Sequence, residues 1–261
     1  MPDETGAAGT ADAERRRAAE LLVLLDRRSG PVLKVNQAVP STRFTALRGA
    51  NLVGLTVARR HAPQRGRVDE RAAVAVLDAV GPASVAVSFE KTDGFTENEM
   101  AGALERLGAD YYEFTPADPE KRDAFAHDLA RLARLPLPKI ANGFFLESDD
   151  GSLLGATDTL RRLTEAGVVL FQIEIAPDAL TSPSVRARLA ALFTEFPVVV
   201  CLPPGVGLPP GLPSPRGYSV TLRPPDRDTT HYDYCTSAVP VSAAARVLRA
   251  RAQDREDAPS G

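Results

Sequence analysis

The chain has 261 residues, a formal net charge of −3, 44% hydrophobic residues and 25% charged residues. The hydrophobic fraction is that of a globular protein, which excludes a wholly disordered chain. The slightly negative charge excludes the strongly basic surface of a typical nucleic-acid-binding domain. At roughly 150 residues per domain, the length fits one large domain or two small ones.

The two cysteines, Cys201 and Cys235, can form neither a disulfide scaffold nor a four-cysteine zinc site. We expect reduced thiols, as in a cytoplasmic protein. The first apolar run, 21–25, is shorter than the core of a signal peptide. No stretch approaches the ~18 apolar residues of a membrane span. The sequence therefore predicts a cytoplasmic protein that binds neither nucleic acid nor a membrane, and it leaves the oligomeric state open.

Residues 1–11 are small and polar, and we expect a disordered tail there and at 253–261. The spacing of apolar residues predicts a helix over 12–28. From residue 31 onward, short β-rich runs alternate with amphipathic runs up to residue 252. The predicted strands are 32–39, 52–57, 84–89, 110–114, 139–145, 168–175 and 198–202, with an eighth at either 218–222 or 231–235. The predicted helices are 42–48, 69–80, 97–107, 120–132, 157–166, 185–196 and 241–251.

Helix-ending and helix-starting residues support these boundaries. Thr96 and Glu99 have the spacing of a capping box. A glycine suited to a C-terminal cap follows four of the helical runs, at Gly49, Gly81, Gly108 and Gly167. Strands that are almost continuously apolar indicate a parallel sheet covered on both faces. No Gly-x-Gly-x-x-Gly follows the first strand, so we predict a single (β/α)₈ TIM barrel over 12–252 rather than a doubly wound sheet. The proline-rich segment 203–225 has no helical period, so the seventh helix is expected to be lost or replaced by a loop.

In a parallel barrel, side chains at the carboxyl ends of the strands face the active-site mouth. Alternation places Lys34 with Asn36, Ser88 with Glu90, Tyr111 with Glu113 and Thr115, and Gln172 with Glu174. A core that only needed filling would use Val, Ile or Leu at these positions. We therefore predict a catalytic set in which Glu174 is the acid–base group, assisted by Lys34, Asn36, Glu113 and Asp233. A structural alternative stays open, in which Lys34 forms an interior ion pair with Glu113 or Glu174.

A basic loop follows the second strand and contains Arg59, Arg60, His61, Arg65 and Arg67. Guanidinium groups bind carboxylates and phosphates in bidentate geometry, so Arg65 and Arg67 are candidate substrate-binding residues. The three histidines are far apart in sequence and lack zinc-site spacing. We expect no metal and no cofactor, and a small-molecule substrate as the partner.

Three segments resemble phosphoribosylanthranilate isomerase, a barrel enzyme of the ribulose-phosphate-binding superfamily. Lys-Val-Asn-Gln at 34–37 and Gly-Ala-Asn-Leu-Val-Gly at 49–54 resemble the family's opening Lys-Ile-Cys-Gly and its Gly-Ala-Asp-x-Ile-Gly. Gly-Ala-Asp-Tyr-Tyr-Glu-Phe at 108–114 resembles the family's fourth-strand segment. The resemblance runs loosely over 31–252, and it matches the order of the segments better than the motifs themselves.

The family catalyses an Amadori rearrangement of a phosphorylated aminosugar with a cysteine base and an aspartate acid. The resemblance places Asn36 at the cysteine position and Glu174 near the aspartate position, and an amide cannot act as a base near neutral pH. The resemblance also places the phosphate-binding residues at Gly205, Gly207, Thr236 and Ser237. Prolines at 203 and 204 remove backbone donors that a phosphate would need.

Three functions remain open from the sequence. The first is a diverged isomerase-like enzyme of specialised biosynthesis that moves protons during isomerisation or cyclisation of a small polar metabolite. The second is a Schiff-base lyase or aldolase that uses Lys34 or Lys139, because a buried lysine can become nucleophilic. The third is a non-catalytic barrel that binds a ligand or a partner.

Overall fold

The computed structural model of the protein describes residues 32–37, 52–61, 67–80, 83–146, 157–202 and 206–222. The predicted helices 12–28, 42–48 and 241–251 lie outside the described residues. So do both predicted tails and the alternative strand at 231–235.

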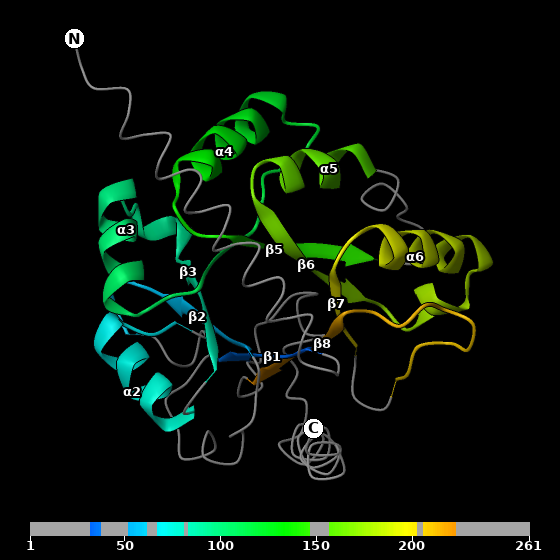
Figure 1. The fold of residues 1–261 in the computed structure, drawn as a ribbon, viewed down its shortest axis with the longest axis horizontal. Coiled ribbons are helices and arrows are strands. Elements are labelled where there is room, and N and C mark those ends of the chain that lie inside the picture. Colours follow the sequence, from blue (N-terminus) through cyan, green and yellow to red (C-terminus); the bar gives the residue numbers. More distant parts are fainter. Residues whose placement is uncertain are drawn as a thin grey trace, which may run out of the picture.

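The described strands form a closed barrel in which neighbours in sequence are neighbours in space (Figure 1). All pairings are parallel, including the closing pair, in which Val32 through Gln37 of β1 lie opposite Gly217 through Leu222 of β8. The strands are β1 (Val32–Gln37), β2 (Leu52–Val57), β3 (Ser84–Phe89), β4 (Tyr111–Phe114), β5 (Lys139–Leu146), β6 (Val168–Ile175), β7 (Val198–Cys201) and β8 (Gly217–Leu222). Each described strand agrees with a predicted one to within a few residues at either end.

Helices pack around the outside of the strands, which gives an α/β fold (Figure 1). The α-helices are α2 (Glu70–Val80), α3 (Glu97–Arg106), α4 (Arg122–Arg134), α5 (Thr157–Glu165) and α6 (Pro183–Glu195). Two 3-10 helices, η3 (Lys91–Asp93) and η4 (Asp178–Thr181), follow β3 and β6. Because several connections lie outside the described residues, a complete set of eight strand–helix units is not shown. Within the described parts of the chain, no helix is long and apolar enough to cross a membrane.

The last strand resolves an ambiguity that the sequence leaves open. The strand that pairs with both β7 and β1 is Gly217–Leu222, which corresponds to the first of the two predicted positions. Residues 206–216, which precede it, contain no helix, in agreement with the expected replacement of the seventh helix by a loop. Gly217 faces the backbone of Val32 so closely that an added Cβ would collide with it. A glycine at this position therefore lets β8 close the barrel against β1.

Two apolar cores lie on opposite faces of the sheet. The larger one fills the space between the strands and the helices. The smaller one fills the lower part of the barrel interior with Val32, Leu52, Ala86, Tyr111, Ile140, Leu170 and Val199. Side chains alternate along a strand, so the next inward position of each strand lies two residues closer to its carboxyl end. These next inward residues are mostly polar, and they form a second layer inside the barrel.

The capping residues predicted for the start of α3 and for the ends of α3 and α5 are confirmed, whereas α4 (Arg122–Arg134) lies two residues further along the chain than predicted. Thr96 and Glu99 form both hydrogen bonds of a capping box at the start of α3. Gly108 and Gly167 have φ values of 59° and 91°, a conformation in which a Cβ is strained. These two glycines end α3 and α5 and turn the chain into β4 and β6.

Candidate functional site

Lys34 lies at the centre of a polar layer inside the barrel. Its side chain is fully buried, and Nζ donates to Asn36 Oδ1 at 2.5 Å, Glu113 Oε1 at 2.6 Å and Gln172 Oε1 at 2.7 Å. An ammonium group has three protons, so these three oxygens satisfy it. The predicted interior ion pair is therefore present, and its carboxylate partner is Glu113.

Asn36 and Gln172 extend this layer to the last strand. Asn36 Nδ2 donates to Ser219 Oγ at 2.9 Å, and Ser219 Oγ donates to Gln172 Oε1 at 3.1 Å. The group thus contains four residues that the sequence singled out as inward-facing: Lys34, Asn36, Glu113 and Gln172. Ser219 was not anticipated, because the position of the eighth strand was ambiguous.

Asn142 is a second residue whose place in the site was missed. Its Nδ2 donates to Glu113 Oε1 at 2.7 Å, and its Oδ1 accepts from Thr115 Oγ1 at 2.5 Å. The pairing of β5 with β6 shifts register between Ala141 and Phe144, and Gly143 has a φ of 80°. A bulge of this kind re-aims a side chain, and it requires glycine because other residues are strained there. The Asn-Gly pair at 142–143 is the sequence signal that could have indicated the bulge.

Gly54 of β2 provides the room that the polar layer needs. A Cβ at this position would collide with Asn36 Oδ1 and would lie 3.1 Å from Glu113 Oε2 and 3.4 Å from Lys34 Nζ. Packing therefore explains the glycine at this position, because the Lys34 ammonium and its acceptors occupy the volume that a larger side chain would need.

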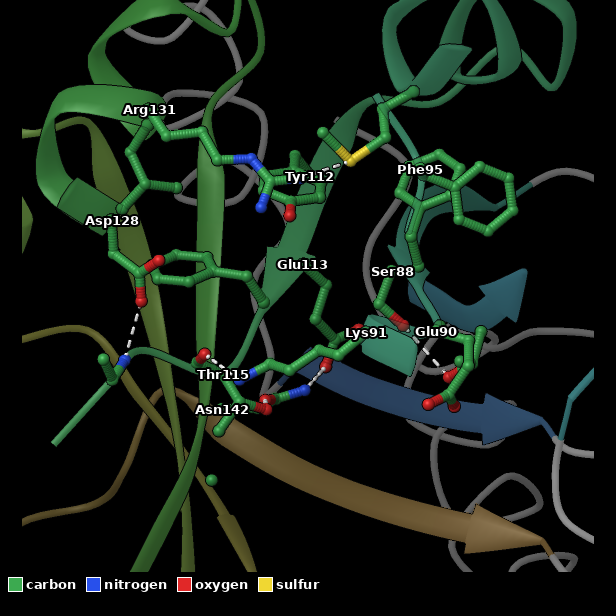
Figure 2. A pocket seen from close by; sticks show the side chains of 18 of the residues that line it. Ser88, Glu90, Lys91, Phe95, Tyr112, Glu113, Thr115, Asp128, Arg131 and Asn142 are labelled. Atoms are coloured by element: carbon green, nitrogen blue, oxygen red, sulfur yellow. Dashed lines mark hydrogen bonds between the residues drawn. The ribbon is translucent and has the colours of Figure 1, made fainter. Parts of the chain in front are cut away.

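A cavity of about 790 Å³ opens above the polar layer. Asn36, Glu113, Asn142 and Gln172 line its floor together with Glu174. Glu174 follows Gln172 by two residues on β6 and therefore points to the same inner side, and it is 9% exposed. Figure 2 shows Glu113, Thr115 and Asn142 gathered at one end of the cavity and Ser88 and Glu90 at another. The structure thus brings the predicted acid–base residue to the wall of an open cavity.

The cavity also extends outward between α3 and α4. We call this part the side lobe and define it by Phe95, Met100, Tyr112, Phe114, Arg131 and Leu132. The sequence did not predict it, because Tyr112 and Phe114 point away from the barrel interior, and such residues are ordinarily core.

The basic loop binds carboxylates of the protein itself. Arg67 Nε lies 2.5 Å from Glu90 Oε2. The backbone N–H of Arg59 donates to Asp93 Oδ2. Its Nη2 donates to both carboxylate oxygens of Glu99 at 2.9 Å. Its guanidinium carbon lies 4.6 Å from the centroid of the Phe95 ring. These contacts fix the loop after β3 beside the loop after β2. Arg67 nevertheless lies next to a cavity residue, since Glu90 lines the cavity.

The other predicted substrate-binding and catalytic residues are not brought to the cavity by the described structure. Gly207 is exposed and does not line it. Arg65, Gly205, Asp233, Thr236 and Ser237 lie outside the described residues. Among the described residues, no group of three His, Cys, Asp or Glu side chains is arranged to hold a metal ion.

Lys139 and Cys201 differ from the sequence-based expectations. Lys139 Nζ donates to Leu135 O at 2.8 Å and packs under Gly167, at the amino end of β5 and away from the cavity. Cys201 is buried at the end of β7 and is disulfide-bonded, so the expectation of a reduced thiol is wrong for this residue. Because disulfides persist mainly in oxidising compartments, this bond gives no support to the expected cytoplasmic location.

No protein-family model and no curated protein matches the sequence. Solved structures do match, at low identity. KGPDC from Streptococcus mutans has a TM-score of 0.51 at 12% identity, over 86% of this chain and 98% of that one. Phosphoribosyl anthranilate isomerase from Thermococcus kodakaraensis has a TM-score of 0.47 at 16% identity, over 84% and 99% of the two chains. A 2,3-dimethylmalate lyase has a TM-score of 0.48 at 14% identity, over 94% and 89%. The likeness to KGPDC supports a TIM-barrel-like fold, and at this identity it is a likeness of fold alone.

Proposed function

We propose that this protein is an enzyme of the isomerase type, which moves a proton on a small polar metabolite bound in the cavity above the polar layer. The metabolite would isomerise or cyclise. The proposal keeps the single (β/α)₈ barrel predicted from the sequence, in which a loop replaces the seventh helix.

The observation that carries the proposal is that two carboxylates of the barrel interior, Glu113 and Glu174, line one cavity. Glu113 Oε1 accepts from Lys34 and from Asn142, so its charge is balanced and its position is fixed. Glu174 lies on the wall of the same cavity, two residues along β6 from Gln172. One carboxylate therefore anchors the layer, and the other is placed to exchange a proton with a ligand. General acid–base catalysis requires the catalytic carboxylate to lie within hydrogen-bond distance of the reacting group of the ligand.

The remaining polar groups have positioning roles in this proposal. Lys34 holds the side-chain oxygens of Asn36, Glu113 and Gln172, which fixes their orientation before a ligand enters. Donors fixed in this way cost little reorganisation during the reaction. Asn36 and Asn142 both line the cavity, so their amide groups can orient a carbonyl or hydroxyl group of the metabolite.

The Schiff-base alternative receives no support from either lysine. Lys34 donates to three acceptors at 2.5–2.7 Å and is fully buried, which leaves its nitrogen no approach path to a carbonyl. Lys139 does not line the cavity.

The test is proton exchange with solvent. The purified protein is incubated in D₂O with a panel of hydroxy-carbonyl compounds and aminosugars, both phosphorylated and phosphate-free, and loss of C–H signals is followed by proton NMR. We expect exchange in at least one compound, slowed about 10²–10⁴-fold in Glu174→Gln, the usual contribution of an acid–base group. Glu165→Gln, an exposed carboxylate at the end of α5, is the matched control and should leave the rate unchanged.

Two outcomes contradict the proposal. Exchange at the wild-type rate in Glu174→Gln removes the role of Glu174. Binding of a panel compound with no exchange in any of them favours the non-catalytic barrel instead.

A further inference from the structure

The side lobe differs chemically from the polar layer. Its walls are aromatic or aliphatic side chains, Phe95, Met100, Tyr112, Phe114 and Leu132, and it contains one cation, Arg131. Asp128 of α4 also lines the cavity, beside Arg131. A pocket with mostly apolar walls and a cation is suited to an apolar ligand group that carries a negative charge.

Arg131 has an unusual set of contacts for a half-buried guanidinium. Its Nη2 donates to Met100 Sδ at 2.8 Å, and among the described residues no carboxylate lies within ion-pair distance of it. A thioether sulfur is a weak acceptor, so most of the hydrogen-bonding capacity of the guanidinium is unused. Figure 2 shows Arg131 reaching from α4 toward Tyr112.

The nearest carboxylate on the same helix is directed elsewhere. Asp128 Oδ2 accepts from the backbone N–H of Ala117 at 2.8 Å and thereby ties α4 to the loop after β4. Figure 2 shows Asp128 and Arg131 pointing away from each other. Asp128 and Arg131 both line the cavity, but Asp128 binds the loop after β4 and does not form an ion pair with Arg131.

Tyr112 adds a second polar group at the same place. The residue is 6% exposed, and its ring stacks on Phe114 with centroids 5.9 Å apart. Within the described structure, no hydrogen bond of its hydroxyl is found. Burial raises the pKa of this hydroxyl, so it stays a neutral donor near neutral pH. Tyr112 lines the cavity, so an anionic oxygen bound between Tyr112 and Arg131 could accept hydrogen bonds from both groups.

We propose that the side lobe is a binding subsite for an apolar group that carries a carboxylate or phosphate, with Arg131 and Tyr112 as its anion-binding residues. This proposal rests on the small-molecule function proposed for the cavity, because the subsite opens into the same space as Glu174. It adds that the natural ligand has two parts, a polar reacting part over the polar layer and an apolar anionic part between α3 and α4.

Binding of small aromatic probes tests the subsite without knowledge of the natural ligand. Benzoate, phenyl phosphate and benzyl alcohol are titrated into the purified protein by calorimetry at constant ionic strength. We expect both anions to bind more tightly than the neutral alcohol. In Arg131→Gln the Kd of both anions should rise at least about tenfold, since a charge-assisted pair is lost, and the Kd of the alcohol should not change.

Three further variants complete the design. Arg122→Gln removes an exposed arginine from the start of the same helix and should bind all three probes as the wild type does. Arg131→Lys keeps the charge but loses the planar fork, so a weakening of about threefold is expected, as for Tyr112→Phe. Unfolding midpoints of all variants establish that they are folded, and Arg131→Lys and Tyr112→Phe keep the test valid if Arg131→Gln does not fold.

The proposal is overturned if Arg131→Gln binds both anions as tightly as the wild type, or if the wild type binds neither anion more tightly than benzyl alcohol. Glu174→Gln should bind the probes normally. If no proton exchange is detected but the probes bind as expected, the result supports the subsite and contradicts the proposed enzymatic function. If exchange occurs and the probes do not bind, only the subsite is wrong.

Discussion

Lys34 Nζ lies 2.6 Å from Glu113 Oε1, so an ion pair links β1 to β4 across the interior of the barrel. Both side chains are almost completely buried, and transferring two charges from water is expensive. Asn36, Gln172 and Asn142 supply the additional hydrogen bonds that make such a pair tolerable. The pair and its partners form a fixed polar floor under the cavity.

Removal of the cation from this pair should be strongly destabilising. In Lys34→Met, the Glu113 carboxylate stays buried without its ammonium, and we expect a loss of about 3–5 kcal/mol in the free energy of unfolding. The double variant Lys34→Met/Glu113→Gln buries no charge and should recover most of this loss. Urea denaturation of the three proteins at neutral pH measures both effects.

The exposed pair of Arg106 and Glu70 is the control for this measurement, because Arg106→Gln removes a cation of similar size from the surface. We expect a several-fold smaller loss there, since water screens the pair. A Lys34→Met protein within about 1 kcal/mol of the wild type would show that the interior pair is not a stabilising contact.

The sequence predicted the inward-facing polar residues because strand alternation depends only on local geometry. This alternation directly predicts that four residues face the barrel interior: Lys34, Asn36, Glu113 and Gln172. It could not decide whether Lys34 pairs with Glu113 or Glu174, because that depends on the stagger of strands distant in sequence. The partner is Glu113, which lies on β4.

Asn142 and the side lobe were missed for two further physical reasons. The bulge at Gly143 changes the direction of Asn142 relative to simple alternation. Tyr112 and Phe114 alternate outward, as core residues do, and only the packing of α3 and α4 leaves space beside them. The alternation of residues along one strand cannot predict how helices distant in sequence pack against that strand.

The absence of a side chain at Gly54 should also matter for stability. In Gly54→Ala the new methyl group would meet Asn36 Oδ1, and the polar layer can move only by breaking the hydrogen bonds of Lys34. We expect a loss of about 1–3 kcal/mol, as for other overpacked interiors. Denaturant unfolding provides the measurement.

Gly102 of α3 is the matched control for Gly54. A Cβ there would meet only the flexible end of Arg106, at 3.1 Å. Because glycine is unfavourable inside a helix, Gly102→Ala should gain about 0.5–1 kcal/mol. Opposite signs for the two Gly→Ala changes are expected, and equal effects would mean that the space beside Gly54 is not limiting.

Tyr112 should make stability depend on pH in the alkaline range. Burial raises its pKa above the ordinary value of 10.0, Arg131 opposes the shift, and Asp128 adds to it. As the pH rises past 10.0, the unfolded chain loses this proton before the folded protein does, so stability falls. The unfolding free energy of Tyr112→Phe should decline less steeply above this pH, and tyrosinate absorbance should show one late-titrating group fewer. A Tyr112 that ionises at the ordinary pKa of 10.0 contradicts this expectation.

Glu99 should make stability depend on pH in the acid range. The backbone N–H of Thr96, the side chain of Arg59 and the Thr96 hydroxyl all donate to its carboxylate, and they lower its pKa from 4.5 to about 2. A lowered carboxyl pKa stabilises the folded state above the unfolded value of 4.5, and this contribution is lost as the pH falls through about 2. Carboxyl NMR titration should show that Glu99 titrates near 2. In Glu99→Gln the decline of stability between these two pH values should be shallower than in the wild type. A Glu99 that titrates near 4.5 would mean that the capping box and the contact with Arg59 do not persist in solution.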